Sequence, residues 1–227
     1  CPAKKVTGGL SGSALMRDLD HALRLIDAVV GAVAVPVTLK CRLGWDEDCR
    51  NAAGLARRAE AAGVRMVTVH GRTRQQFYAG RADWAAIRAV SDAVAIPVVA
   101  NGDIVDPGTA RAALAASGAA GVMVGRGTRG APWRPAEIAA ALSGAAPPKI
   151  PSGPALADYI SDHYEDMLRF YGNAPGLRVA RKHLGWYAEE AGIDPAFRAG
   201  LMLAESPGEV LGLIARAFAE TGERRAA

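Results

Sequence analysis

Four short apolar runs, separated by helical patterns, constrain the fold of this chain more than any other feature. The runs are rich in β-branched residues and cover residues 35–41, 65–70, 96–101 and 120–126. They are largely apolar throughout rather than alternating, which is typical of strands buried on both faces of a parallel sheet. Parallel strands need crossover helices, and these crossovers are right-handed. The sequence therefore predicts a series of βα units.

Helical spacing of apolar residues predicts helices over 14–33, 51–62 and 84–93, between the predicted strands. A further helix is expected to open at Asp106 and Pro107, because an Asp N-cap followed by Pro is a helix-start signal. This order fits either an open doubly wound sheet or a β/α barrel.

The polar residues near the strand ends favour the barrel. They are Lys40, His70, Asn101 and Arg126. Barrel active sites draw residues from the tips of several strands, whereas a doubly wound sheet concentrates its site at one switch point. Four strands are half of a barrel, and the chain begins at Cys1 rather than Met. We therefore predict an α/β fold that is the C-terminal half of a (β/α)8 TIM barrel, with the other strands upstream.

The composition changes after a segment rich in Pro and Gly. Beyond it, amphipathic helices are predicted over 156–170, 177–191 and 208–219, which indicates a small all-α helical domain. The predicted organisation is a half-barrel over 1–145, a linker over 146–154 and a helical domain over 155–227.

Charge is distributed unevenly along this sequence. Residues 1–153 carry 19 Lys and Arg against 12 Asp and Glu, and the remainder carries 8 against 11. A basic surface suits a phosphate or polyanion ligand, although a solvated basic surface remains an alternative. With no apolar run of membrane length, no signal-peptide pattern and three cysteines, the chain is expected to be cytoplasmic, without a membrane partner.

Two glycine-containing loops predict a phosphate site. Asn101-Gly102-Asp103 follows the third predicted strand and Gly125-Arg126-Gly127 follows the fourth. Glycine lets backbone N–H groups approach an anion, and Arg126 adds a bidentate partner. The alternative is that both loops are ordinary tight turns.

The remaining polar residues leave more alternatives open. Lys40 in a barrel mouth needs an anion, such as a flavin or a neighbouring carboxylate. His70, taken alone, is better explained as a structural histidine. Cys1, beside Lys4 and Lys5, is either reactive or inert. Neither a nucleotide-binding glycine motif nor a metal-ligand spacing is present.

Basic residues in the predicted loops and tail suggest a large polyanion. Arg42 follows the first predicted strand, and Arg72 and Arg74 follow the second. Arg178, Arg181 and Lys182 share one helix face. Solvated helix charge is the alternative for the tail cluster.

Several motifs together resemble the bacterial tRNA-dihydrouridine synthases, in their B-type branch, over essentially the whole chain. They are CPAKKV with GSAL (1–6 and 12–15), VTLKCRLGW (37–45), TVHGRTRQQFYAG with ADW (68–84), IPVVANGDI (96–104), GVMVGRGTRGAPW (121–133) and RVARKHLGWY (178–187).

The resemblance implies an FMN enzyme that uses NADPH to reduce uridine to 5,6-dihydrouridine in the tRNA D-loop. It implies that Cys1 protonates C5 while reduced flavin gives hydride to C6, and that His70 lies near flavin and uracil. The implied FMN contacts are Lys40, Asn101, Gly102, Asp103, Gly125 and Arg126. The expected tRNA contacts are Lys4, Lys5, Arg72, Arg74, Arg178, Arg181 and Lys182. We expect a monomer.

Two other functions remain alternatives. One is another FMN barrel oxidoreductase, similar to dihydroorotate dehydrogenase, that acts on a free pyrimidine. The other is a truncated RNA-binding protein without catalysis. Because half of the predicted barrel would lie upstream, we expect the 227-residue chain alone to retain little or no FMN and to show no turnover.

Overall fold

The structure is a computed structural model, and it describes residues 2–218. The chain forms two compact units, Cys1–Gly127 and Thr128–Ala227. Residues 145–152 have no regular secondary structure, and the predicted division at 146–154 stays a prediction. Among the described residues, no helix is both long and apolar enough to cross a membrane.

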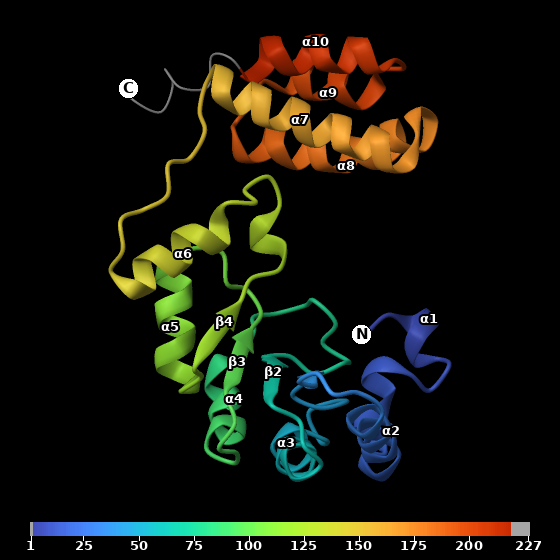
Figure 1. The fold of residues 1–227 in the computed structure, drawn as a ribbon, viewed down its shortest axis with the longest axis vertical. Helices are drawn as coiled ribbons and strands as arrows, with labels where there is room; N and C mark the ends of the chain where they lie inside the picture. Colours follow the sequence, from blue (N-terminus) through green and yellow to red (C-terminus); the bar gives the residue numbers. More distant parts are fainter. Residues whose placement is uncertain (1, 219–227) are drawn as a thin grey trace. The chain divides into compact units, whose positions relative to one another are not determined.

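The first unit is built on a sheet of four parallel strands, shown in Figure 1. Its strands are β1 (Thr38–Arg42), β2 (Met66–His70), β3 (Val98–Asn101) and β4 (Gly121–Met123), and they pair in the order β1-β2-β3-β4. Each strand therefore lies beside the next strand in the sequence. A doubly wound sheet reverses its strand order, whereas a barrel keeps it, so this topology is that of a barrel segment.

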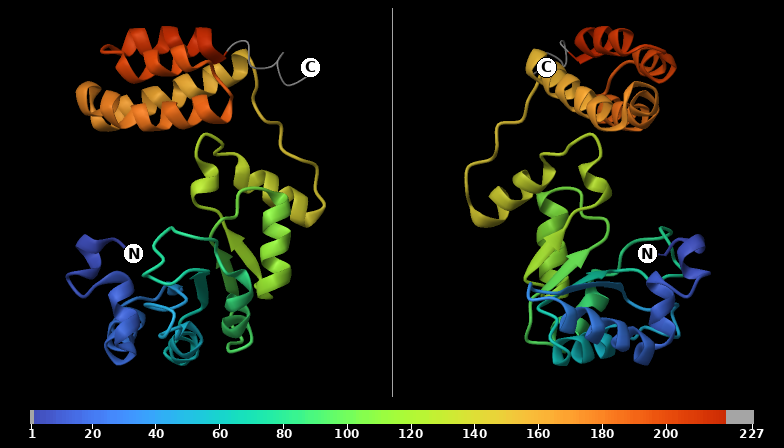
Figure 2. Two further views of the ribbon diagram at one scale, coloured as in Figure 1. Left: turned by 180° about the vertical axis from the view of Figure 1, so that it is seen from behind. Right: turned by 45° about the vertical axis from the view of Figure 1, so that its right-hand side comes forward.

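Helices cover one face of this sheet, as both views of Figure 2 show. They are α3 (Ala52–Ala61), α4 (Trp84–Ser91) and α5 (Pro107–Ser117), each between or beside the strands that it contacts. The core lies between helices and sheet, where Val67, Val69 and Ala100 are fully buried. Successive strand residues point to opposite faces of a sheet, so the residues that alternate with these three along β2 and β3 point away from the helices.

The residues before the sheet form short helices rather than one long helix. They are α1 (Lys4–Thr7), the 3-10 helix η1 (Gly12–Arg17) and α2 (Leu19–Ala32). The helix predicted from residue 14 begins at Leu19, because the Asp18 carboxylate accepts a hydrogen bond from the His21 amide at 2.9 Å and caps α2. At α5, the predicted start is confirmed: Asp106 and Thr109 form a capping box.

The second unit is helical. After the short η2 (Arg126–Thr128) at the boundary come α6 (Arg134–Ser143), α7 (Pro154–Tyr171), α8 (Asn173–Glu190), α9 (Pro195–Leu203) and α10 (Pro207–Phe218). Helices α7 to α10 enclose one apolar core, in which Ile160, Leu184 and Ile214 are almost fully buried. The sequence predicted α7, α8 and α10 but not α9, although Asp194 and Pro195 carry the same start signal as α5.

Gly176 lets α7 and α8 approach closely near the turn that joins them. A Cβ at this position would lie about 3.0 Å from the Leu168 Cα and 3.1 Å from the Met167 carbonyl oxygen. Both of these atoms belong to the α7 backbone, which cannot move aside as a flexible side chain can. The close approach of the two helices therefore requires glycine here.

We predict that Gly176→Ala lowers the free energy of unfolding by about 1–2 kcal/mol, because overpacking outweighs the better helix propensity of Ala. The control is Gly212→Ala in α10, where a Cβ meets nothing within 4 Å. It should keep or raise stability. Urea unfolding followed by circular dichroism measures both, and equal effects of the two substitutions would contradict the packing argument.

Candidate active site

A row of polar side chains crosses the sheet at the carboxyl ends of its strands. Arg42 pairs in register with His70, and His70 pairs with Asn101. Lys40 lies two residues before Arg42 and therefore on the same face, opposite Thr68. The structure thus brings the predicted residues Lys40, His70 and Asn101 together. It adds Arg42, which sequence reasoning placed among general basic loop residues although its i+2 spacing from Lys40 puts both on one face.

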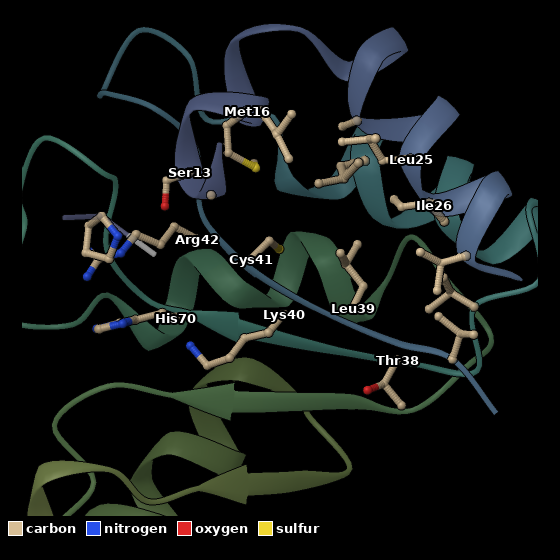
Figure 3. A pocket seen from close by; sticks show the side chains of 18 of the residues that line it. Ser13, Met16, Leu25, Ile26, Thr38, Leu39, Lys40, Cys41, Arg42 and His70 are labelled. Carbon is tan, nitrogen blue, oxygen red and sulfur yellow. The ribbon is translucent and has the colours of Figure 1, made fainter. Parts of the chain in front are cut away.

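Lys40, Arg42 and His70 line a cavity of about 440 Å³ beside β1 and α2. Figure 3 shows their side chains gathered at one end of it, away from the apolar side chains of Leu25 and Ile26. Asn101, Gly102, Asp103, Gly125 and Arg126 do not line this cavity. They lie at the ends of β3 and β4.

Lys40 has no counter-ion among the residues that the structure describes. It forms no ion pair with any residue from 2 to 218, which disfavours the salt-bridge explanation of this lysine. Partial desolvation and the neighbouring Arg42 lower the pKa of its ammonium. Unpaired cations in a cavity are costly, so this position is suited to an anionic ligand.

His70 is buried and electrically neutral. Burial, reinforced by the charges of Arg42, Lys40 and Arg72, lowers its pKa to about 3. Arg72 Nη1 lies 3.3 Å from His70 Nε2, and a guanidinium only donates, so Nε2 accepts. The proton of the neutral ring is therefore assigned to Nδ1, which makes that atom a hydrogen-bond donor.

Arg72 joins the loop after β2 to the loop after β3. It is 1% exposed, and its guanidinium donates to both Asp103 carboxylate oxygens at 2.9 and 2.6 Å. It also donates to the carbonyls of Ala79 at 3.0 Å and Gly80 at 2.6 Å. The sequence predicted Arg72 as a tRNA contact; its donors are engaged inside the protein, where they hold these two loops.

Asp103 is the acceptor on which this arrangement depends. Burial alone would raise its pKa, but hydrogen bonds from Arg72 and from the Ala82 amide outweigh burial and lower it. Arg126 approaches the same carboxylate at 3.3 Å while remaining half exposed. The predicted cofactor residues Asp103 and Arg126 therefore contact each other directly.

Two aromatic side chains that the sequence analysis did not select lie in the loop after β2. Phe77 and Tyr78 form an edge-to-face pair with ring centroids 4.7 Å apart, and both are nearly half exposed. The Tyr78 ring lies between two guanidinium groups, at 4.7 Å from Arg126 and 5.6 Å from Arg42. Tyr78 also lines the cavity. The Gln-Gln-Phe-Tyr run between Arg74 and Gly80 is the sequence feature from which these two rings could have been selected.

The N-terminal segment is tied to the loops after β1 and β2. Arg74 donates to the Thr7 hydroxyl at 2.9 Å, and its guanidinium lies 4.7 Å from the Trp45 ring. Arg17 approaches the same ring at 5.1 Å. Asn51 donates to the Met16 carbonyl at 2.7 Å. Cys1, the predicted proton donor, lies outside the described residues.

The other predicted RNA-contacting residues differ in their freedom. Lys4 and Lys5 are exposed on α1. In the helical unit, Arg178 and Lys182 are exposed on α8, whereas Arg181 is partly buried and donates to the Ala204 carbonyl at 3.2 Å.

The two described cysteines differ from a reactive thiol. Burial raises the pKa of Cys41 to about 12, so its thiol stays protonated and inert at neutral pH. Cys49 is partly buried, and its sulfur accepts a hydrogen bond from Asn51. Over the described part of the chain, no three His, Cys, Asp or Glu side chains are grouped as a metal site would require.

Comparisons with known proteins agree with these motifs. The family model described as "Dihydrouridine synthase (Dus)" matches residues 1–221. A Rhodobacter capsulatus protein named "Probable tRNA-dihydrouridine synthase" is 67% identical over 97% of this chain and 67% of its own length. The "tRNA-dihydrouridine synthase B" of Xanthomonas campestris pv. campestris is 47% identical over 94% of this chain and 64% of its own length. This chain therefore spans about two thirds of the length of these relatives.

The likeness to solved structures is weak. A mandelate oxidase crystal structure matches with a TM-score of 0.37 and 22% identity, over 89% of this chain and 67% of that chain.

We predict that Arg72→Met lowers the free energy of unfolding by about 3 kcal/mol, because the Asp103 carboxylate loses its buried partner. Arg126→Met is the matched control, since it removes an exposed cation from the same carboxylate and should cost less than about 1 kcal/mol. Urea unfolding of both variants tests this difference, and an equal cost would refute the assigned role of Arg72.

Stability should also depend on pH through His70. Its pKa in the folded state lies below the ordinary histidine value of 6.5, so the unfolded chain binds the extra proton and stability falls as the pH drops below about 6.5. Between pH 7 and pH 5 this group should remove about 2 kcal/mol from the free energy of unfolding. His70→Gln should abolish that part of the loss in urea titrations; an unchanged pH dependence would mean that His70 is not held neutral.

Proposed function

This chain belongs to the dihydrouridine synthase family, and on that premise we propose that its protein reduces uridine to 5,6-dihydrouridine in the D-loop of tRNA. The observation that best supports the proposal is Lys40, which forms no ion pair with any described residue and lies on the same sheet face as the neutral His70 at the carboxyl end of β2. Barrel enzymes place their chemistry at this end of the strands.

The residues of the cavity suit FMN, with NADPH as the reductant. The volume of about 440 Å³ is that of a small-molecule site, and Lys40 and Arg42 supply cations at its polar end. When bound, FMN supplies hydride-transfer chemistry, and a cation near its pyrimidine edge favours the reduced form. No described carboxylate pairs with Lys40, and this is the specific observation that supports the fit of an anionic group.

The loops after β3 and β4 are the proposed remainder of the cofactor site. Asn101 donates to the Met123 carbonyl at 2.9 Å and so holds the ends of these two strands together. A Cβ on Gly125 would meet nothing within 4 Å, which leaves space beside this backbone. We assign Gly102, Gly125 and Arg126 to the phosphate end of FMN, where backbone N–H groups and a guanidinium suit an anion.

Reduction of uracil adds one hydride and one proton to the ring. Hydride addition at C6 leaves negative charge that is relieved when an acid protonates C5. Cys1 is the proposed acid, since a thiol with an ordinary pKa near 8.5 is protonated at neutral pH. His70 remains neutral with an N–H on Nδ1, and this group is suited to donate to a carbonyl oxygen of the base without giving up its proton.

The proposed tRNA contacts are the exposed cations. Lys4, Lys5, Arg178 and Lys182 are all exposed, and phosphate contacts by such residues position nucleic acids. Arg74 and Arg181 are partly buried and hydrogen-bonded, and we place them at the margin of this contact. For Arg72 we propose a positioning role instead. A monomer acting on tRNA in the bacterial cytoplasm completes the proposal.

The experiment uses the chain as given and a version extended at Cys1 with the preceding segment of the Rhodobacter capsulatus relative. Unmodified tRNA, FMN and NADPH are supplied, and dihydrouridine is measured by mass spectrometry. We expect product only with the extended protein. Yellow, flavin-loaded preparations of the shorter chain would contradict the expected poor FMN retention, and absence of product from both would refute the proposed activity.

In the extended protein, Cys1→Ala should still bind FMN and accept electrons from NADPH, but it should form dihydrouridine about 100-fold more slowly or worse, because the general acid is gone. Cys49→Ser is the matched cysteine control and should remain active. Flavin reduction is followed by absorbance, separately from product. Normal product formation by Cys1→Ala would show that another group protonates C5.

A further inference from the structure

Two aromatic side chains project from the turn between α7 and α8. Phe170 is 81% exposed and Tyr171 is 48% exposed, and their ring centroids lie 4.8 Å apart in an edge-to-face pair. Phe170 is the most exposed large apolar side chain in the described part of the chain. Neither ring belongs to the apolar core of the helical unit. We refer to these two residues as the turn platform.

The backbone holds the turn platform in place. Only Gly172 separates α7 from α8, and its φ of 79° is a left-handed conformation that favours glycine. Its amide donates to the Leu168 carbonyl at 2.8 Å and closes α7. The close packing at Gly176 fixes α8 against α7 just beyond the turn. The rings are therefore displayed by a short, well-packed turn, which limits the entropy lost when they bind a ligand.

Cations without acidic partners follow the turn platform along α8. Arg178 and Lys182 are four residues apart and therefore on one helix face. Both are exposed, and neither forms an ion pair with any residue that the structure describes. Arg178 lines two shallow hollows. Lys182 and His183 also line the first, and Arg181 and Glu205 also line the second.

This positive strip stands out because its surroundings are acidic. Residues 154–227 carry 8 Lys and Arg against 11 Asp and Glu. Three of those eight, Arg178, Arg181 and Lys182, lie within five consecutive residues of α8. The cations are thus concentrated in one stretch of α8, the helix that follows the exposed rings, rather than dispersed over the unit. Stacking surfaces beside unpaired cations are how proteins hold unpaired nucleotides, through the base and the phosphate respectively.

We propose that the turn platform stacks an unpaired base of tRNA, while Arg178 and Lys182 bind the phosphates beside that nucleotide. The proposal rests on the proposed function and specifies what the helical unit recognises: a splayed nucleotide rather than helical RNA alone. A docked protein would also cover exposed rings, but it would not by itself explain the unpaired cations beside them. RNA is therefore the occupant that the charges favour.

The test measures binding of a fluorescein-labelled, unmodified tRNA transcript to the full chain by anisotropy, without flavin. Phe170→Leu keeps an apolar side chain but removes the ring, and it should weaken binding by about five- to 150-fold. Phe170→Tyr keeps the ring and should bind as the parent does. Leu203→Ala, at a side chain that is 75% exposed in the same unit, is the control and should have no effect.

A competition experiment isolates the unpaired base. Unlabelled single-stranded RNA should displace tRNA from the parent chain better than duplex RNA of equal length, and Phe170→Leu should lose this preference. Unchanged binding by Phe170→Leu, or equal losses in the Leu and Tyr variants, would overturn the proposal while leaving the enzymatic function intact. If the parent chain binds no tRNA, the proposed role of the turn platform is wrong. If tRNA binding depends on Phe170 but the extended protein makes no dihydrouridine, only the proposed enzymatic activity is wrong. A change in oligomeric state alone would assign the rings to a protein contact.

Discussion

The ion pair between the buried Arg72 and the partly exposed Asp103 is the interaction on which the candidate active site depends. The four strands are only three to five residues long, so they cannot by themselves fix the loops that follow them. Arg72 fixes two of these loops at once, because its donors satisfy a carboxylate after β3 and two carbonyls after β2. A lysine, with a single ammonium, does not offer this planar fork of donors.

The same network explains why the loops after β2 and β3 tolerate unusual backbone conformations. Asp103 and Phe77 adopt positive φ values of 55° and 53°, which are uncommon for residues other than glycine. Such conformations cost of order 1–3 kcal/mol each and persist where surrounding contacts determine them. Arg42 donates to the Phe77 carbonyl at 2.7 Å, and the Ala82 amide binds Asp103. Gly102, at φ 112°, lets the backbone pass over the His70 ring, because an added Cβ would lie 2.8 Å from His70 Cδ2.

The limits of sequence reasoning follow from which interactions are local. Strand runs, the Asp106 cap and the polar residues near the strand ends could be predicted, because each is encoded by neighbouring residue types. The Arg72–Asp103 pair joins residues 31 positions apart, and an arginine in a loop after a strand is more simply explained as an exposed cation. The register that aligns Arg42 with His70 and Asn101 is equally non-local. The rings of the turn platform were not selected from the sequence, because Phe170 is the last residue of a predicted amphipathic helix and Tyr171 directly follows it.

The electrostatics near the strand ends explain why this arrangement suits an anionic ligand. Lys40, Arg42 and Arg72 lie around His70. Of these three cations, only Arg72 forms an ion pair with a carboxylate among the described residues. Keeping His70 neutral lowers the local repulsion but leaves two cations without anions. An anionic ligand that binds only the folded state would relieve this repulsion and stabilise the fold by mass action. Binding of the proposed flavin and the stability of the half-barrel should therefore be coupled through Lys40 and Arg42, because the positive charge that would favour a reduced flavin is the same charge that an anionic ligand would neutralise.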